Sequence, residues 1–266
     1  MSVKVDFHTH SYYSDGELSP TELIKWAKEN EISTIALTDH DVTDGVKEAK
    51  IAGDALDVTV VSGVELSSMD EKGNELHILG YYIDVDNIEL RAACMKASAH
   101  RDERNEKYYK ILEDEFSITK EDLLETAGRD FIGKSTIAKT MARKGIISKR
   151  EDAFSMSGFF HREDIEKIVK EKMTAKDAID VIKEAGGIAV LAHPGRIKGI
   201  GKPDTEEFYG NFDKLLRQLK KDGLKGLECI YSSHSDSERL KFIEFAEKYH
   251  LHITEGSDFH GNGQYG

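Results

Sequence analysis

The first polar residues of the chain have the types and the spacing of a metal site. The chain opens with Val3-Lys4-Val5 and continues into residues 6–16, so a short buried strand that runs into a polar turn is expected here. Side chains alternate along a strand, which places His8 and His10 on one face. The turn can return the carboxylate of Asp15 to the same place. Two imidazoles and a carboxylate suit a divalent transition metal. The alternative for these residues alone is one exposed and one hydrogen-bonded histidine at the end of a strand.

More histidines and acidic residues stand at the ends of other predicted strands. In a parallel barrel of strands and helices, functional groups gather at the carboxyl ends of the strands. The candidate ligands are His8, His10, Asp15, His40, Glu65, His77, His193, Asp258 and His260. Any one of them alone could be a core histidine or a helix cap. A catalytic zinc ion takes about three protein ligands, so the set predicts a site for two or three divalent ions.

The elements that must position these residues are alternating strands and helices. The first strand is expected to open with Val3-Lys4-Val5, and further strands are expected at residues 34–38, 58–64, 75–83, 187–192, 226–230 and 252–255, with helices between most of them. This alternation predicts right-handed crossovers and a largely parallel sheet. Too few residues follow the last strand for an eighth unit. The fold class is therefore α/β, a distorted seven-stranded TIM-like barrel.

Two local features refine this barrel. The link between strands 58–64 and 75–83 is short, so these strands are expected to form a hairpin with Glu65 and His77 at one end of the sheet. Proline after His193 is expected to keep this histidine extended, as at the end of a strand.

Residues 86–172 lose the strand pattern and are expected to form a helical insertion that caps the substrate. Helices are predicted at residues 92–112, 120–126, 135–144 and 162–172. The barrel would then comprise residues 1–85 and 173–266. Most of the charges on the insertion are expected to be solvated.

Composition excludes several classes of protein. The formal net charge of -13 argues against a long nucleic-acid partner but not against a small anionic ligand. No apolar run reaches the length of a membrane span, and the first residues lack the apolar stretch of a signal peptide. The only cysteines, Cys94 and Cys229, are expected to be free thiols in a reducing cytoplasm, so a metal would bind to histidines and carboxylates.

These motifs together resemble the PHP family (polymerase and histidinol phosphatase), and the resemblance extends over the whole chain. The matching segments are His8-Thr9-His10, Thr38-Asp39-His40, Gly63-Val64-Glu65, His77, Ala192-His193-Pro194-Gly195-Arg196 and Gly256-Ser257-Asp258-Phe259-His260-Gly261. The resemblance implies a distorted (β/α)7 barrel with two or three metals, usually manganese, iron or zinc. It also implies one metal on His8, His10, Glu65 and Asp258, a second on Asp15, His40 and His260, and a third on Glu65, His77 and His193.

The most similar branch of that family is the stand-alone phosphoesterases with an insertion. The resemblance implies action on small nucleotides, such as nucleoside 3′,5′-bisphosphates, or on the 5′ end of short oligoribonucleotides. Where that branch usually has Arg-Pro-His, this chain has Lys134 within Gly133-Lys134-Ser135-Thr136. Lysine offers a point charge and arginine a bidentate fork, so the phosphate selectivity is expected to differ.

The expected reaction is hydrolysis of a phosphate monoester by a hydroxide that bridges metals, because coordination lowers the pKa of water from about 15.7 to about 7. Asp15, Glu65 and His260 would act as catalytic metal ligands. Arg196 is the expected phosphate clamp, unless it is an ordinary surface arginine. The remaining predicted substrate contacts are Lys134, Arg143 and His234, the last also a candidate proton donor to the leaving group. Asp39 and Asp41 are expected either to orient ligands or to cap a helix.

Three other functions fit parts of this pattern. A histidinol-phosphate phosphatase would use the same site with a different pocket. A metal-binding regulatory module without catalysis would be expected to have lost ligands, whereas all nine are present. Metal-dependent amide hydrolysis would typically use a carboxylated lysine at a strand end, and none is predicted there.

Overall fold

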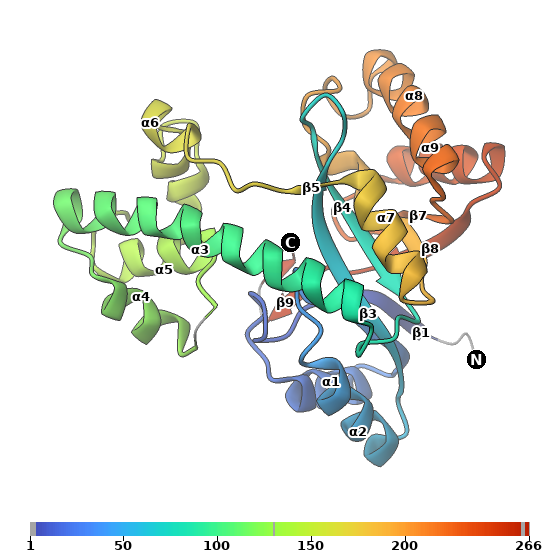
Figure 1. Cartoon of the computed structure of the whole chain (residues 1–266), viewed down its shortest axis with the longest axis horizontal. Coiled ribbons are helices and arrows are strands. Elements are labelled where there is room, and N and C mark those ends of the chain that lie inside the picture. The colour runs from blue at the N-terminus through green and yellow to red at the C-terminus, as the bar shows by residue number, and fades with distance from the viewer. Residues whose placement is uncertain (1–3, 130, 262–263, 266) are drawn as a thin grey trace. The chain divides into compact units, whose positions relative to one another are not determined.

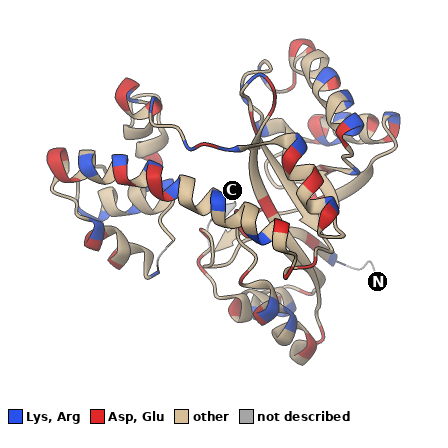
Figure 2. Ribbon diagram, viewed as in Figure 1, with Lys and Arg blue, Asp and Glu red and all other residues tan. Residues whose placement is uncertain are grey.

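The computed structural model describes residues 4–129, 131–261 and 264–265. The chain divides into two compact units (Figure 1). The first unit comprises Met1–Met95 and Lys172–Gly266, and the second comprises Lys96–Glu171. Figure 2 shows that charges of both signs are interspersed along the helices, whereas the strands are mostly uncharged. Among the described residues, no helix is both long enough and apolar enough to cross a membrane.

The first unit is built on one curved sheet with the strand order β10-β9-β1-β2-β3-β4-β6-β7-β8. Its seven longer strands are β1 (Lys4–Thr9), β2 (Ile32–Leu37), β3 (Thr59–Met69), β4 (Glu75–Tyr81), β6 (Ile188–Leu191), β7 (Gly226–Tyr231) and β8 (His252–Gly256). The short strands are β5 (Met173–Thr174), β9 (Phe259–Gly261) and β10 (Gln264–Tyr265). Because β8 lies beside β1, the sheet closes almost completely. The predicted TIM-like barrel is confirmed, with the short strand β9 added next to β1.

Strand β4 is antiparallel to both of its neighbours, β3 and β6, so the predicted hairpin is confirmed. The prediction that the third strand ends before Glu65 is wrong. Residues 59–62 of β3 pair with β2, and residues 63–69 continue the same strand by pairing with β4. The β4 ladder satisfies the backbone of β3 beyond the point where β2 ends. His77 lies opposite Ser67, so Glu65 and His77 are diagonal neighbours on one face.

Five helices pack their apolar faces on the outside of this barrel. They are α1 (Pro20–Glu29), α2 (Val46–Leu56), α7 (Ala175–Glu184), α8 (Glu206–Asp222) and α9 (Asp236–Lys248). The start of α1 is set by Ser19 and Glu22, which form the predicted capping box. One apolar cluster joins α1 and α2 to the first strands, and a second joins the other three helices to β3, β4, β6 and β7. The inner face of the sheet has a smaller apolar cluster that includes Val61, Leu79 and Tyr81. It also has polar residues such as Glu65 and Glu228, both of which are completely buried.

The second unit is helical and has an apolar core of its own. Helix α3 (Ile88–Phe116) begins in the first unit and continues into the second, which also contains α4 (Lys120–Ala127), α5 (Lys134–Arg143) and α6 (Glu163–Glu166). Its core includes Tyr108, Leu112, Leu123, Ile137 and Phe159. The predicted helix at residues 162–172 is wrong, since only Glu163–Glu166 is helical. Ile165 and Ile168 pack on the core of this unit, but Val169 is exposed, so the apolar positions of residues 162–172 do not share one buried helical face.

Candidate metal centre

Glu65 is the centre of the site, and the structure gathers the predicted ligands around it. Its carboxylate is completely buried and surrounded by ring nitrogens of five histidines. Oε2 lies 3.2 Å from His8 Nε2, 3.3 Å from His10 Nε2 and 3.0 Å from His40 Nδ1. Oε1 lies 2.8 Å from His77 Nδ1 and 3.0 Å from His193 Nε2.

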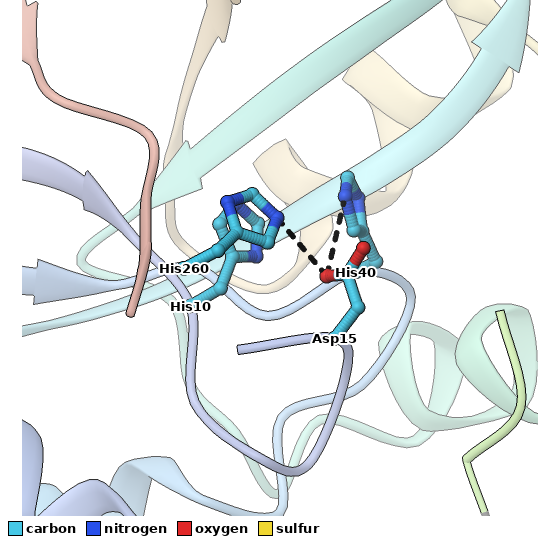
Figure 3. Close-up of side chains that lie close together, drawn as sticks. All are labelled: His10, Asp15, His40 and His260. Atoms are coloured by element: carbon cyan, nitrogen blue, oxygen red, sulfur yellow. Dashed lines mark ion pairs between the residues drawn. The ribbon is translucent and has the colours of Figure 1, made fainter. Parts of the chain in front are cut away.

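Two aspartates, Asp258 and Asp15, also contact histidines of this arrangement. Asp258 follows β8, and its Oδ1 atom lies 3.0 Å from His10 Nε2. Asp15 lies in the turn after β1, and its Oδ1 atom is 3.1 Å from His260 Nε2 and 3.8 Å from His40 Nε2 (Figure 3). All nine predicted ligands are therefore linked to one another by contacts shorter than 4 Å.

Five of these ligand atoms are buried without a hydrogen bond. They are His8 Nε2, His10 Nε2, Asp15 Oδ1, His40 Nδ1 and Glu65 Oε2. Buried polar atoms normally have a hydrogen-bond partner, and leaving one without a partner costs free energy. These atoms lie close to one another but are not aligned to form hydrogen bonds. Lone pairs that converge in this way fit a cation between them.

Within the part of the chain that the structure describes, the geometry offers three overlapping sets of donors, each with its atoms within 4.8 Å of one another. The sets are His8, His10, Glu65 and Asp258; His10, Asp15, His40 and His260; and His40, Glu65 and His77. The first set is the one that the family resemblance implies. The second gains His10, and the third contains His40 in the place where the resemblance implies His193. Nitrogen and carboxylate donors of this kind suit manganese, iron or zinc.

The carboxylates and histidines of this cluster shift the pKa values of one another. Burial alone would lower the pKa of His10, but the carboxylates of Asp258 and Glu65 raise it to about 10. In the same way Glu65 and Glu75 raise the pKa of His77 to about 9. Burial would raise the pKa of Glu65, and the histidines around it hold that pKa well below its usual value. The metal-free site therefore binds protons, and a metal that binds there has to displace them.

Further polar residues hold the ligands in place, and sequence reasoning identified only some of them. Asp39 accepts hydrogen bonds from Ser11 N, Ser11 Oγ and Ser14 Oγ at 2.6 to 2.7 Å, which fixes the turn that carries Asp15. Asp41 accepts from the backbone and the hydroxyl of Ser67 on β3. Both aspartates therefore support the ligand-bearing segments of the site.

His193 differs from its prediction, because it is not extended. Its φ is 24° and its ψ is 62°, and Pro194 begins a 3-10 turn whose Arg196 N donates to His193 O at 2.9 Å. The backbone N of His193 donates to Glu228 Oε2 at 2.6 Å. These two bonds hold the backbone in a conformation that residues other than glycine rarely adopt.

Arg196 lies at the edge of the site and is held by a tyrosine that sequence reasoning missed. Half of its side chain is exposed, and its Nη1 donates to Tyr231 Oη at 2.8 Å. The hydroxyl of Tyr231 in turn donates to Asp258 Oδ2 at 3.0 Å. Tyr231 thus connects the predicted phosphate clamp to a metal-ligand candidate. The sequence did contain a signal for Tyr231, because this residue stands at the end of a strand, as the predicted ligands do.

His234 is next to this turn but is buried and fully engaged. Gly195 N donates to its Nε2 at 3.3 Å, and its Nδ1 lies 3.2 Å from Cys229 O. Burial lowers the pKa of His234, which favours the neutral ring. The structure therefore does not place His234 to contact substrate or to donate a proton to a leaving group, because the backbone occupies both ring nitrogens.

Lys134 and Arg143 belong to the second unit and interact within it. Lys134 Nζ lies 5.3 Å from the centre of the Phe160 ring. Arg143 Nη2 donates to Glu125 Oε2 at 3.0 Å and to Asp122 O at 3.1 Å. Their contact with substrate stays a prediction.

Several curated relatives match almost the whole chain. A phosphoribosyl 1,2-cyclic phosphate 1,2-diphosphodiesterase of Eggerthella lenta is 29% identical over 96% of this chain and 94% of its own length. A 5′-3′ exoribonuclease of Haemophilus influenzae is 30% identical over 98% and 91%. A 3′,5′-nucleoside bisphosphate phosphatase of Chromobacterium violaceum is 30% identical over 98% and 89%.

A solved structure and a family model also match this chain. An amidohydrolase from Chromobacterium violaceum, solved with bound sulfate and no metal, superposes with a TM-score of 0.86 at 28% identity, over 99% of this chain and 89% of that one. The model of the PHP domain matches residues 6–232. The chain belongs to the PHP domain family and is a metal-dependent hydrolase of phosphoric esters.

Proposed function

We propose that the chain hydrolyses a phosphate monoester of a small nucleotide, such as a nucleoside 3′,5′-bisphosphate or the 5′ end of a short oligoribonucleotide. The observation that carries this proposal is the set of five buried ligand atoms without hydrogen bonds, beside a half-exposed arginine. One of the relatives is named for the phosphatase reaction of nucleoside 3′,5′-bisphosphates, and another is named as a 5′-3′ exoribonuclease.

The residues of the site would hold two or three divalent ions, either manganese, iron or zinc. When bound, such ions polarise phosphoryl oxygens and lower the pKa of a water molecule from about 15.7 to about 7. The three carboxylates, Asp15, Glu65 and Asp258, cannot neutralise the charge of two or three such ions. The site would then be positive and would attract a phosphate dianion, even though the protein as a whole is acidic.

Arg196 would bind and orient the phosphate. Tyr231 and Asp258 engage only its Nη1 atom, and among the described residues nothing engages Nε or Nη2. A guanidinium anchored at one nitrogen can still direct its other N–H groups to two oxygens of one phosphate. The sulfate bound to the structurally similar protein from Chromobacterium violaceum supports a site for a tetrahedral anion.

The size of the substrate follows from charge. A net charge of -13 opposes contact with many phosphates of a long nucleic acid. A bisphosphate or the first nucleotides of a short strand need only the local positive charge of the site. Lys134 and Arg143 of the second unit remain candidates for contacts with the rest of the substrate.

The test is a comparison of substrates with the manganese-loaded full-length chain, with products separated by chromatography. The substrates are adenosine 3′,5′-bisphosphate, a 5′-phosphorylated triribonucleotide, a ribose 1,2-cyclic phosphate and histidinol phosphate. The Glu65→Gln and His193→Ala variants, purified in the same way, control for contaminating phosphatases.

Hydrolysis of either nucleotide, lost in both variants, is the expected result. Hydrolysis of only the cyclic ester or only histidinol phosphate would refute the proposed substrate class and leave the metal chemistry in place. No hydrolysis of any of the four by a metal-loaded protein would favour a regulatory metal-binding module.

A further inference from the structure

Glu228 is a buried carboxylate that joins two of the candidate metal ligands from behind. It lies in the middle of β7, and its side chain is completely buried. Oε1 lies 2.9 Å from His8 Nδ1, and Oε2 accepts the backbone N–H of His193 at 2.6 Å. Neither oxygen belongs to any of the three sets of donors that could hold an ion. Glu228 therefore contacts candidate metal ligands but is not itself one of the candidate ligands.

We propose that Glu228 is a positioning residue that orients His8 and His193 toward the metals. The proposal rests on the metal-dependent function above. A carboxylate can only accept a hydrogen bond, so Nδ1 of His8 must carry the proton that the two share. A neutral imidazole has one N–H group, and its other nitrogen, Nε2, then keeps the lone pair that a metal needs.

The Nε2 atom of His8 lies among the other candidate metal ligands, as this role of Glu228 requires. His8 Nε2 is one of the five buried atoms without a hydrogen bond, and it lies 3.2 Å from Glu65 Oε2 and 3.4 Å from Asp258 Oδ1. Without Glu228 the ring could bind its single proton at either nitrogen. Nothing would then keep the proton away from the metal side.

The second oxygen of Glu228 acts on the backbone of His193. That residue has a φ of 24°, which is unfavourable for a side chain with a Cβ atom and persists only where surrounding contacts enforce it. The 2.6 Å bond from its N–H to a carboxylate is such a contact, and its short length fits a charged acceptor. His193 Nε2 is thereby held 3.0 Å from Glu65 Oε1. One buried carboxylate thus orients ligands on both oxygens of Glu65.

A glycine on the neighbouring strand makes room for this arrangement. Gly256 ends β8 beside β7, and a Cβ atom there would lie 2.4 Å from His8 Cβ and 2.5 Å from Glu228 Oε1. Contacts this short do not occur between real side chains. The absence of a side chain at position 256 therefore permits Glu228 to reach His8.

The Glu228→Gln substitution tests the proposal, because an amide of the same shape cannot replace both functions. If its oxygen accepts from His193 N, its NH2 group faces His8 Nδ1 and drives the proton of that ring to Nε2. If it is turned around, the NH2 group faces the N–H of His193. Either orientation loses one of the two ligands.

The experiment is a titration of the metal-free wild type and Glu228→Gln with cobalt(II) as the probe, followed by its visible spectrum. Cys229→Ser is the matched control, since Cys229 is the next residue of β7, is buried, and packs in the outer apolar cluster. The expected result is about 10- to 100-fold weaker cobalt binding and a changed spectrum for Glu228→Gln. Cys229→Ser should bind cobalt as the wild type does.

A second measurement needs no variant of Glu228 and so does not depend on its folding. In the zinc-loaded wild type, nitrogen-15 NMR of His8, assigned by comparison with His8→Gln, should show the proton on Nδ1 and the metal on Nε2. The reverse assignment would overturn the proposal, as would unchanged cobalt binding and spectrum in Glu228→Gln. Both experiments measure metal binding without a substrate. If the proposed hydrolysis fails, they still test whether Glu228 orients the metal ligands.

Discussion

Replacing Tyr231 with phenylalanine tests whether the arginine and the metal ligands work as one unit. The hydroxyl of Tyr231 donates to Asp258 Oδ2 at 3.0 Å and accepts from Arg196 Nη1 at 2.8 Å. Burial raises the pKa of Tyr231, so the hydroxyl keeps its proton at neutral pH and continues to donate. Phenylalanine keeps the ring and its packing and removes both of these contacts.

The size of the effect follows from those contacts. A hydrogen bond to a charged group is worth about 1.5–3 kcal/mol. The bond to Asp258 is buried and should count nearly in full, whereas Arg196 is half exposed and its bond is weakened by solvent. We therefore expect Tyr231→Phe to lower the free energy of unfolding by about 1–3 kcal/mol. We also expect kcat/KM for the phosphate ester to fall about 10- to 100-fold, which corresponds to about 1.4–2.7 kcal/mol.

The assay is steady-state hydrolysis by the manganese-loaded protein together with thermal unfolding. Tyr249→Phe is the matched control, because the Tyr249 hydroxyl donates to Asp213 Oδ1 at 2.8 Å and neither residue belongs to any of the three donor sets. In addition, Arg196→Lys and the double variant with Tyr231→Phe should show losses that do not add, since both changes disturb one network. A value of kcat/KM for Tyr231→Phe within twofold of the wild type would refute the reasoning.

Two further predictions follow from the same contacts. Gly256→Ala should lower the free energy of unfolding by about 1–3 kcal/mol in chemical denaturation and weaken metal binding, because its Cβ would overlap His8 and Glu228; unchanged stability would show that β8 can move away from β1. In the metal-free protein, the pKa values of His10 and His77 are raised to about 10 and about 9, above the unfolded value of about 6.5, so their stabilisation is complete below about pH 6.5 and is lost as the pH rises through 9 to 10. Thermal unfolding in chelator should therefore show stability falling over this range, and His77→Gln should reduce the fall; an equal fall in the variant would contradict the assigned cause.

Much of the barrel and its ligand set could be predicted from local patterns in the sequence. Alternation along β1 placed His8 and His10 on one face, and the short link before β4 predicted the hairpin that brings His77 to Glu65. Both inferences depend only on the geometry of strands, which holds in any tertiary context. The partition of ligands among ions depends on distances between strands that are far apart in sequence. There the structure adds His10 to the set around Asp15.

The features that were missed depend on tertiary contacts. β3 continues past Glu65 only because β4 pairs with it, and the left-handed backbone of His193 is held by Glu228 on another strand. Glu228 did have a signal in the sequence, as a charged residue within the apolar strand Gly226–Tyr231. A carboxylate buried in such a strand needs polar partners, which places it inside the barrel beneath the site.

The central claim is that buried ligands around Glu65 hold more than one divalent ion and that these ions are needed to hydrolyse the phosphate ester. The most direct test is the manganese content per chain after dialysis, measured for the wild type and Glu65→Gln and compared with the rate of ester hydrolysis of the same samples. The account predicts two or three ions in the wild type, fewer in Glu65→Gln, and loss of hydrolysis together with the lost ions. One ion or none in an active wild type, or full activity in Glu65→Gln, would contradict it.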